Sequence, residues 1–238
     1  MYPYIYIILQ SYTLFAFLGS FIAIIFIYFR LDKFNVAFTV FLKLIFLCFI
    51  GGLIGSKILF VITQIPYLTN QFSIVKLLLL ILQSGFVFYG GFFGVIVTII
   101  LYTKKDTTLR SNIFKAAVPA IPLFHIFGRI GCFLAGCCYG KKLNSSFILF
   151  GLLKFNRIPV QIIEAMFEFI LFFFILLLSK KKSTIDILKI YLIFYAIFRF
   201  FIEFFRGDEV RGIFLGLSTS QWISIVILLY YIIKEMKK

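Results

Sequence analysis

Long apolar runs separated by short polar segments are the dominant pattern of this 238-residue chain. A run of about 20 apolar residues is long enough to cross the hydrocarbon core of a bilayer as a helix. Seven runs predict seven membrane-spanning helices, at about 4–29, 38–62, 86–102, 113–135, 160–179, 187–205 and 218–233. The first run begins without a basic segment or a small-residue cleavage site, so we expect a span there and not a removable signal peptide.

A shorter apolar arm at residues 74–83 precedes the third run and ends at Gln83-Ser84-Gly85. It is too short to cross a bilayer alone, and we expect a re-entrant or interfacial segment. The polar linkers between the runs are short, which leaves no room for a soluble domain. We therefore predict an all-α, polytopic membrane helical bundle that forms one domain over residues 1–238.

Composition excludes a soluble protein, because 63% of the residues are hydrophobic, 14% are charged and the mean hydropathy is +1.10. A chain of this kind needs the lipid bilayer as its surroundings. The net charge of +15 would suggest nucleic acid as the partner of a soluble protein. Here we expect the cations to face anionic headgroups and the cytoplasm, and we predict no nucleic-acid partner.

The distribution of Lys and Arg predicts how the chain is oriented. Of the 24 basic residues, 14 fall on one side of the predicted bundle, seven on the other, and three within or at the ends of spans. Cytoplasmic loops carry the excess of positive charge. The N-terminus is therefore predicted outside and the C-terminus in the cytoplasm, with residues 139 onward, 156–159 and 206–212 on the outer side.

A polar segment interrupts the end of the fourth run. Arg129 lies at a depth where an unpaired charge costs between about 2.5 and 17 kcal/mol, and we interpret its compensation as an anionic ligand. His125, one turn earlier on the same face, is either a helix-to-helix hydrogen-bonding partner or a proton carrier. We expect the thiols of Cys132, Cys137 and Cys138 to pack as small apolar groups. A zinc site made of these thiols and the imidazole is disfavoured by the irregular spacing.

Three charges share one helix face at the end of the sixth run, because Arg199, Glu203 and Arg206 are spaced by four and three residues. One interpretation is an ion pair that neutralises itself and has only a structural role. In the other, Glu203 orients an arginine towards a phosphate, whose oxygens match the planar guanidinium. One carboxylate between two arginines would leave a positive charge for the ligand.

A second polar face opens the fifth run, where Gln161, Glu164 and Glu168 recur at helical spacing after Pro159. We expect this face to point into the bundle and not into lipid. Glu164 either neutralises a basic residue of a neighbouring helix or takes part in a ligand site, and the sequence leaves both interpretations open.

Glycines in the second run, Gly51, Gly52 and Gly55, favour close packing against another helix. Lys57 follows them, about a turn and a half from the outer end of that run. Its side chain either reaches the outer headgroups or points inward to help hold an anion.

The third run begins with Tyr89, Gly90 and Gly91 shortly after the polar break. A glycine pair allows a ligand or another helix to approach the backbone closely. Tyr89 is either an ordinary interfacial aromatic residue or part of a site.

Six segments together resemble the prolipoprotein diacylglyceryl transferases of bacterial plasma membranes. Each segment alone is a weak signal, but six in family order across nearly the whole chain form a specific one, and the predicted seven spans with an outward N-terminus agree with the family. The segments are Gly51-Gly-Leu-Ile-Gly-Ser-Lys57, Phe88-Tyr-Gly-Gly-Phe-Phe-Gly94, Gly128-Arg-Ile-Gly-Cys-Phe-Leu-Ala-Gly-Cys-Cys-Tyr-Gly140, Pro159-Val-Gln-Ile-Ile-Glu164, Phe198-Arg-Phe-Phe-Ile-Glu-Phe-Phe-Arg206 and Leu217-Ser-Thr-Ser-Gln-Trp-Ile-Ser224.

The resemblance implies transfer of a diacylglyceryl group from phosphatidylglycerol to a cysteine thiol in the signal region of a prolipoprotein. The products would be a thioether and glycerol phosphate, with no metal or cofactor required. By position, Arg129 and Arg199 would be the essential arginines, and Glu203 and Arg206 would support the second. The further site residues that we predict are the catalytic candidates Tyr89 and His125 and the binding candidates Gly90, Gly91, Gly128, Gly131, Gln161, Glu164 and Lys57.

The chain departs from the family at positions that usually serve polar ligand contacts. Tyr89 replaces a usual histidine, and Cys132, Ala135 and Cys137 replace two asparagines and a glutamate. Tyr89 could therefore act as a hydrogen-bonding group or a weak base, with His125 as the alternative proton acceptor. Two other functions stay open: a transferase of the same fold with another lipid donor or acceptor, and a non-catalytic membrane protein that binds anionic lipid.

Overall fold

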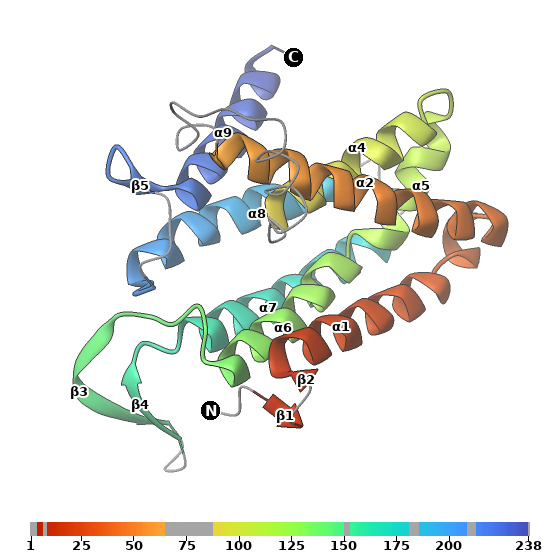
Figure 1. Cartoon of the computed structure of the whole chain (residues 1–238). Helices are drawn as coiled ribbons and strands as arrows, with labels where there is room; N and C mark the ends of the chain where they lie inside the picture. The colour runs from red at the N-terminus through yellow and green to blue at the C-terminus, as the bar shows by residue number, and fades with distance from the viewer. Residues whose placement is uncertain are drawn as a thin grey trace, which may run out of the picture. The chain divides into compact units, whose positions relative to one another are not determined.

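The structure is a computed structural model that describes residues 4–6, 9–64, 88–149, 153–180, 186–208 and 213–237, and it is mostly helical (Figure 1). The predicted arm at residues 74–83 lies outside these ranges. The helices are α1 (Ser11–Tyr28), α2 (Phe38–Gln64), α4 (Phe88–Tyr102), α5 (Thr107–Ala117), α6 (Ala120–Ala135), α7 (Val160–Lys180), α8 (Ile187–Ile202) and α9 (Thr219–Met236), with the 3-10 turns η1 (Asp32–Phe34) and η3 (Glu203–Phe205).

Short antiparallel strand pairs accompany the helices. Strand β1 (Tyr4–Tyr6) pairs with β2 (Leu9–Gln10), β3 (Lys142–Leu149) with β4 (Leu153–Arg157), and β5 (Ile213–Phe214) with β6 (Leu217–Ser218). Each of these sheets has two strands. Strands β3 to β6 lie in connections between helices, whereas β1 and β2 precede α1, and the helices carry the fold.

Four stretches of the described residues are long and apolar enough to cross a membrane: Ser11–Tyr28, Phe38–Ile62, Thr107–Ala135 and Val160–Lys180. Tyr89–Tyr102 is a shorter apolar helix. Each of the seven predicted ranges contains a helix. The chain is a polytopic helical membrane protein.

Two predicted element boundaries were wrong. The first helix begins at Ser11 and not near residue 4, because residues of the apolar start pair as strands β1 and β2. The fourth run is divided into α5 and α6, and Pro119 stands at the N-cap of α6. Proline lacks a backbone N–H and is tolerated only at the start of a helix, so it separates the two.

The polarity of α7 is reversed relative to a helix of a soluble protein. Its polar residues Gln161, Glu164 and Glu168 are buried, whereas Phe169 and Ile170 are exposed. Side chains of this kind on the outside fit hydrocarbon, and buried ionisable groups mark the bundle interior. The predicted inward direction of this polar face is confirmed.

The chain forms two compact units, of which the first comprises residues 1–30 and 114–238. In this unit α6 packs against α1 and α7, and α8 packs against α7 and α9 (Figure 1). Small residues set the approach of α1 to α6: a Cβ added at Gly19 would lie 2.8 Å from Cβ of Phe127, and one at Gly131 would lie 2.9 Å from Cβ of Phe15. These glycines let the two backbones come close without a specific polar contact.

The second unit comprises residues 31–113 and is built on the pair α2 and α4. A Cβ added at Gly55 would lie 2.3 Å from the carbonyl oxygen of Gly90, and one at Gly90 would lie 2.4 Å from the oxygen of Gly55. A Cβ at Gly94 would meet the oxygen of Gly51 at 2.2 Å. The prediction that the glycines of the second run serve helix packing is confirmed, and their partners are the glycines of the third run.

We expect Gly90→Ala to lower the thermal unfolding midpoint of the detergent-solubilised protein, because overpacking of a tight contact costs about 1–3 kcal/mol. Gly91→Ala is the matched control, since its Cβ would have its nearest neighbour at 3.4 Å. Comparable midpoints for the two variants would contradict the packing role assigned to Gly90.

Candidate active site

Glu164 of α7 bridges the two arginines that the sequence singled out on α6 and α8. Its Oε2 lies 3.2 Å from Nε of Arg129, and its Oε1 pairs with Nη1 of Arg199. Glu164 is 3% exposed and Arg199 is 5% exposed. Buried charges persist when they are paired, so one carboxylate ties three helices together. The interpretation of Glu164 as the neutralising partner of a neighbouring basic residue is confirmed, with two such residues.

Glu203 makes the second link of this network. Its Oε2 lies 2.9 Å from Nη2 of Arg199 and 3.9 Å from Nη1 of Arg206, as the spacing of four and three residues predicted. Helix α8 ends at Ile202, so Glu203 opens the 3-10 turn η3. The predicted charged face thus continues from the helix into the turn that ends it.

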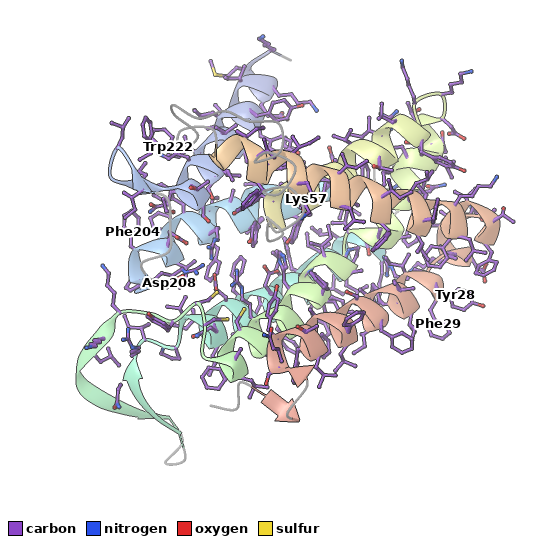
Figure 2. All side chains as sticks on the ribbon, in the orientation of Figure 1. Tyr28, Phe29, Lys57, Phe204, Asp208 and Trp222 are labelled. Atoms are coloured by element: carbon purple, nitrogen blue, oxygen red, sulfur yellow. The ribbon has the colours of Figure 1, made fainter. Side chains whose placement is uncertain are left out.

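Asp208 and Ser220 complete the surroundings of these arginines, and sequence analysis missed both. Asp208 accepts two hydrogen bonds from Arg206, at 3.0 Å from Nε and 2.6 Å from Nη2. Figure 2 labels Asp208 beyond the end of α8. Ser220, in the first turn of α9, accepts a bond from Nη2 of Arg199 at 3.3 Å. The signal available in the sequence was an acidic residue two positions after Arg206. The two hydrogen bonds between Arg206 and Asp208 form only because the chain leaves the helix at this point.

The formal charges of this network are balanced. It contains three guanidiniums and three carboxylates: Arg129, Arg199 and Arg206 with Glu164, Glu203 and Asp208. The positive excess predicted from one carboxylate between two arginines is therefore wrong for this network, because two acids from outside the helical stripe join it. An anion must be held by directed hydrogen bonds and not by a surplus of positive charge.

Arg129 is the arginine whose donors are available. Its side chain is 21% exposed, and its ion pair uses Nε. Among the described residues, its two terminal nitrogens have no assigned hydrogen-bond or ion-pair partner. By contrast, both terminal nitrogens of Arg199 are engaged by Glu164, Glu203 and Ser220. Arg129 can thus present a planar pair of donors to a phosphate or carboxylate, while Arg199 holds the supporting carboxylates.

The two glycines that flank Arg129 have different surroundings. A Cβ at Gly131 would press on Phe15 of α1, whereas a Cβ at Gly128 would have no described atom within 4 Å. Packing therefore explains Gly131, and the packing of the described residues gives no reason for Gly128. Open space beside an accessible guanidinium is what a bound headgroup would need.

We expect Gly128→Ala to leave the thermal unfolding midpoint unchanged or slightly raised, because alanine is favoured over glycine in a helix by about 1 kcal/mol. Gly131→Ala should lower the midpoint through the contact with Phe15. Thermal unfolding in detergent measures both variants side by side. A clear loss of stability in the Gly128 variant would show that this position packs against the protein.

His125 bonds across helices. Its Nδ1 lies 2.9 Å from Oε1 of Glu168 on α7 and 3.3 Å from the hydroxyl of Tyr191 on α8. The ring of Tyr195 is 5.4 Å away from the imidazole, centroid to centroid. The interpretation of His125 as a helix-to-helix hydrogen-bonding residue is confirmed, and its role as a proton carrier stays a prediction.

The segment that follows α6 is held against α7 and the end of α8. Gln161 donates a 2.7 Å hydrogen bond to the carbonyl of Cys137, and Gly207 donates one of 2.9 Å to the carbonyl of Tyr139. A Cβ at Gly207 would lie 2.6 Å from the oxygen of Gly140, and one at Gly140 would lie 2.4 Å from the oxygen of Ile158. The missing side chains of these two glycines thus permit three chain segments to meet beside Arg206.

This segment gathers three thiols. The sulfurs of Cys132, Cys137 and Cys138 all lie within 4.8 Å of one another. Hydrogen bonds from the other two thiols lower the pKa of Cys138, and the positive charges of Arg206 and Arg129 act in the same direction, while burial opposes them. His125, which the disfavoured four-residue zinc site would have included, is not part of this group.

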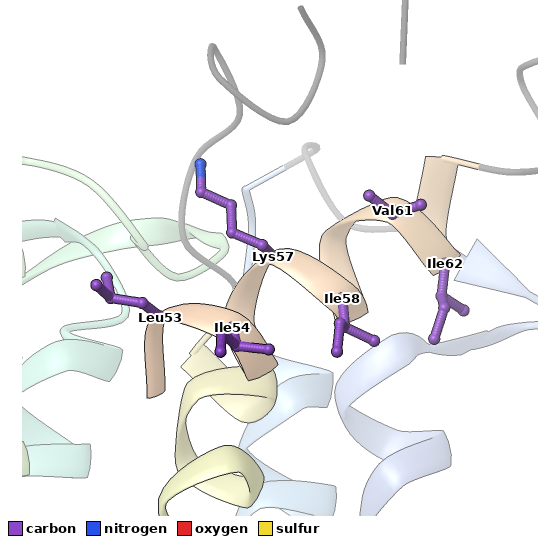
Figure 3. A pocket seen from close by; sticks show the side chains of 6 residues that line it. All are labelled: Leu53, Ile54, Lys57, Ile58, Val61 and Ile62. Carbon is purple, nitrogen blue, oxygen red and sulfur yellow. The ribbon is translucent and has the colours of Figure 1, made fainter. Parts of the chain in front are cut away.

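The remaining predicted site residues lie in the second unit. Gly90 and Gly91 line the contact between α4 and α2. Tyr89 stacks on Phe93, with ring centroids 6.4 Å apart. Lys57 borders a pocket of about 490 Å³ together with Leu53, Ile54, Ile58, Val61 and Ile62 (Figure 3). Figure 3 shows the lysine on the opposite side of the helix from Ile54, Ile58 and Ile62, so it does not turn into that apolar row.

Fold and site together define an integral membrane protein built around a buried ion-pair network with one accessible guanidinium. A sequence profile described as "Prolipoprotein diacylglyceryl transferase" matches residues 4–234. The chain belongs to the prolipoprotein diacylglyceryl transferase family.

Named relatives agree with this assignment. A phosphatidylglycerol–prolipoprotein diacylglyceryl transferase of Clostridium tetani (strain Massachusetts / E88) is 38% identical over 183 residues, which cover 74% of this chain and 72% of the relative. One of Clostridium perfringens (strain 13 / Type A), numbered 2, is 38% identical over 199 residues, or 79% and 76% of the two chains. A third relative, from Rickettsia bellii (strain OSU 85-389), is 32% identical over 199 residues, which cover 78% of this chain and 74% of the relative.

Proposed function

We propose that this chain transfers the diacylglyceryl group of phosphatidylglycerol to the thiol of the lipobox cysteine in the signal region of a prolipoprotein. Family membership and the names of the relatives support this activity. Within the structure, the observation that carries it is the partly exposed Arg129 seated on the buried carboxylate of Glu164. A guanidinium in this setting fits the phosphate of the lipid donor.

In the reaction, the acceptor sulfur forms a bond to the glyceryl carbon that bears the phosphate ester. The bond between that carbon and the phosphate oxygen breaks, its electron pair stays on the oxygen, and glycerol phosphate leaves. Negative charge therefore grows on the phosphate in the transition state. Arg129 donates hydrogen bonds to this phosphate, and preorganised donors of that kind are usually the largest single contribution to catalysis.

The other residues of the network position Arg129 and the outer loop. Arg199 and Glu203 fix Glu164 and Arg206 through direct ion pairs. Gln161 holds the backbone of Cys137 beside them. Arg199 is thus essential because it keeps Glu164 in place, and Arg206 supports it from the outer end.

Two residues are candidates for accepting the thiol proton. The first is His125, whose imidazole is held in place through Nδ1, 2.9 Å from Oε1 of Glu168. The second is Tyr89 on α4, which stacks on Phe93. Lys57 of the second unit is proposed to contact the lipid substrate, and Gly90 and Gly91 to support this role by letting α4 pack closely against α2.

We also propose a single transferase domain with seven spans, an outer N-terminus and a cytoplasmic C-terminus, in the bacterial plasma membrane. A helix in each of the seven predicted ranges and the two-to-one distribution of basic residues support this topology. The acceptor cysteine and the end of α6 would then meet at the outer side.

The purified protein in detergent-lipid micelles, given phosphatidylglycerol and a lipobox peptide, should yield a peptide whose mass has increased by one diacylglyceryl group. The same peptide with cysteine replaced by serine is the control and should stay unmodified. Parallel reactions with other anionic lipids test the donor. Folded protein that gives no product with phosphatidylglycerol but modifies the peptide with another lipid would reassign the donor, and no product with any lipid would overturn the function.

A further inference from the structure

The three thiols at the end of α6 form a group that the ion-pair network does not use. Cys132 is buried, Cys138 is half-buried and Cys137 is exposed, and their sulfurs lie within 4.8 Å of one another. Three sulfurs bound to one zinc ion at about 2.3 Å are separated by about 3.8 Å in tetrahedral geometry. The observed separations therefore require only a small contraction to hold one ion.

The backbone of this segment is shaped to bring the sulfurs together. Gly136 ends α6 with φ of 75°, and Cys138 itself has φ of 56°. A residue with a Cβ in this left-handed region is uncommon, and such strain clusters at functional sites. The reversal at Gly136 and Cys138 folds the chain back so that residues five and six positions after Cys132 face it again.

The ligand type and the exposure of the group suit a metal bound by three thiolates. Soft thiolate ligands select zinc or monovalent copper over hard cations. Three protein ligands with exposure at Cys137 leave one position of a tetrahedral ion open, which is the arrangement of catalytic zinc sites.

We propose that Cys132, Cys137 and Cys138 bind one zinc ion, and that its open fourth position takes the thiol of the acceptor cysteine. This second clause rests on the proposed function. A thiol that coordinates zinc gives up its proton, which passes to the medium. The zinc-bound sulfur then forms the bond to the glyceryl carbon while the carbon–oxygen bond to phosphate breaks. Zinc is not oxidised or reduced, and it leaves the sulfur when the thioether has formed.

Cobalt substitution tests the metal site without any lipid donor. The reduced, detergent-solubilised protein should bind one Co²⁺ per chain, with sulfur-to-cobalt charge-transfer absorption that zinc abolishes. Cys137→Ser and Cys138→Ser should weaken binding by more than about 100-fold, since loss of a supporting residue alone costs about 10–100-fold. Cys48→Ser, in α2, is the matched control and should bind like the wild type. Lack of this absorption in the reduced wild type, or equal loss in the Cys48 variant, would overturn the site.

The fourth position is tested on the same cobalt-loaded protein. A lipobox peptide with cysteine should increase the charge-transfer absorption by about one third, as a fourth thiolate is added to three, and the serine peptide should not. An unchanged spectrum with the cysteine peptide would overturn the open position. Transfer activity is measured separately: a protein that transfers but binds no cobalt overturns the zinc site alone, whereas one that binds cobalt but transfers nothing overturns the proposed function alone.

Discussion

Arg129→Ala is expected to lower transfer of the diacylglyceryl group by about 100- to 1,000-fold, the loss typical when one preorganised donor to developing charge is removed. The reason is geometric: the terminal nitrogens of Arg129 are available while those of Arg199 are engaged. Arg129→Lys should recover only part of the rate, because an ammonium cannot reproduce the planar fork. The rate of lipobox-peptide modification under saturating phosphatidylglycerol measures both variants.

Arg110→Lys is the control for Arg129. Arg110 donates hydrogen bonds to the hydroxyl and carbonyl oxygens of Thr103 at 3.1 and 3.0 Å, and within the described part of the chain its side chain forms no ion pair. The Arg110→Lys variant should transfer the diacylglyceryl group at nearly the wild-type rate. If Arg129→Ala retained more than a tenth of the activity with an unchanged unfolding midpoint, the phosphate would have to be held by another residue.

Glu164→Gln is expected to give the largest loss of stability, because it leaves two arginines without their shared carboxylate. Removing one partner of a buried ion pair costs about 3–5 kcal/mol. Arg199 is 5% exposed, so solvent offers it little compensation. Equilibrium unfolding in mixed micelles should show the loss, and transfer activity should fall with it because Arg129 is no longer held.

Two comparisons make this expectation specific. Glu235→Gln removes the acid from the ion pair between Glu235 and Lys189. The Glu235 side chain is 47% exposed, so this change should lower the free energy of unfolding by less than about 1 kcal/mol. The double variant Glu164→Gln, Arg199→Gln should lose less stability than the sum of the losses of its two single variants. In each single variant one charge of this pair loses its partner, whereas the double variant removes both charges. Strictly additive losses would show that the two residues do not interact.

The helices were predictable, and their ends were less so. A run of about 20 apolar residues has few alternatives to a membrane helix, so each of the seven ranges contains one. The start of α1 and the break between α5 and α6 depend on short strand pairing and on Pro119, which act over a few residues. Hydropathy averaged over a span does not detect either.

The site was predictable where its residues share one helix. Spacing of four and three residues correctly paired Arg199, Glu203 and Arg206, and the polar face of α7 correctly pointed inward. The contact of Glu164 with two other helices depends on how the helices pack, and no spacing along one segment encodes it. Asp208 joins because the chain leaves α8 at that point, and the three thiols meet because the backbone reverses at Gly136 and Cys138.

The bridge through Glu164 also sets an order for biogenesis. A nascent chain that has delivered only α6 to the bilayer carries a lone arginine, which is costly in lipid. The next hydrophobic helix to emerge, α7, brings the acid that neutralises it, and α8 follows with a second cation for the same carboxylate. The three helices therefore leave the insertion machinery most favourably as a group. A chain truncated before residue 164 would keep Arg129 in the bilayer without the acid that neutralises it.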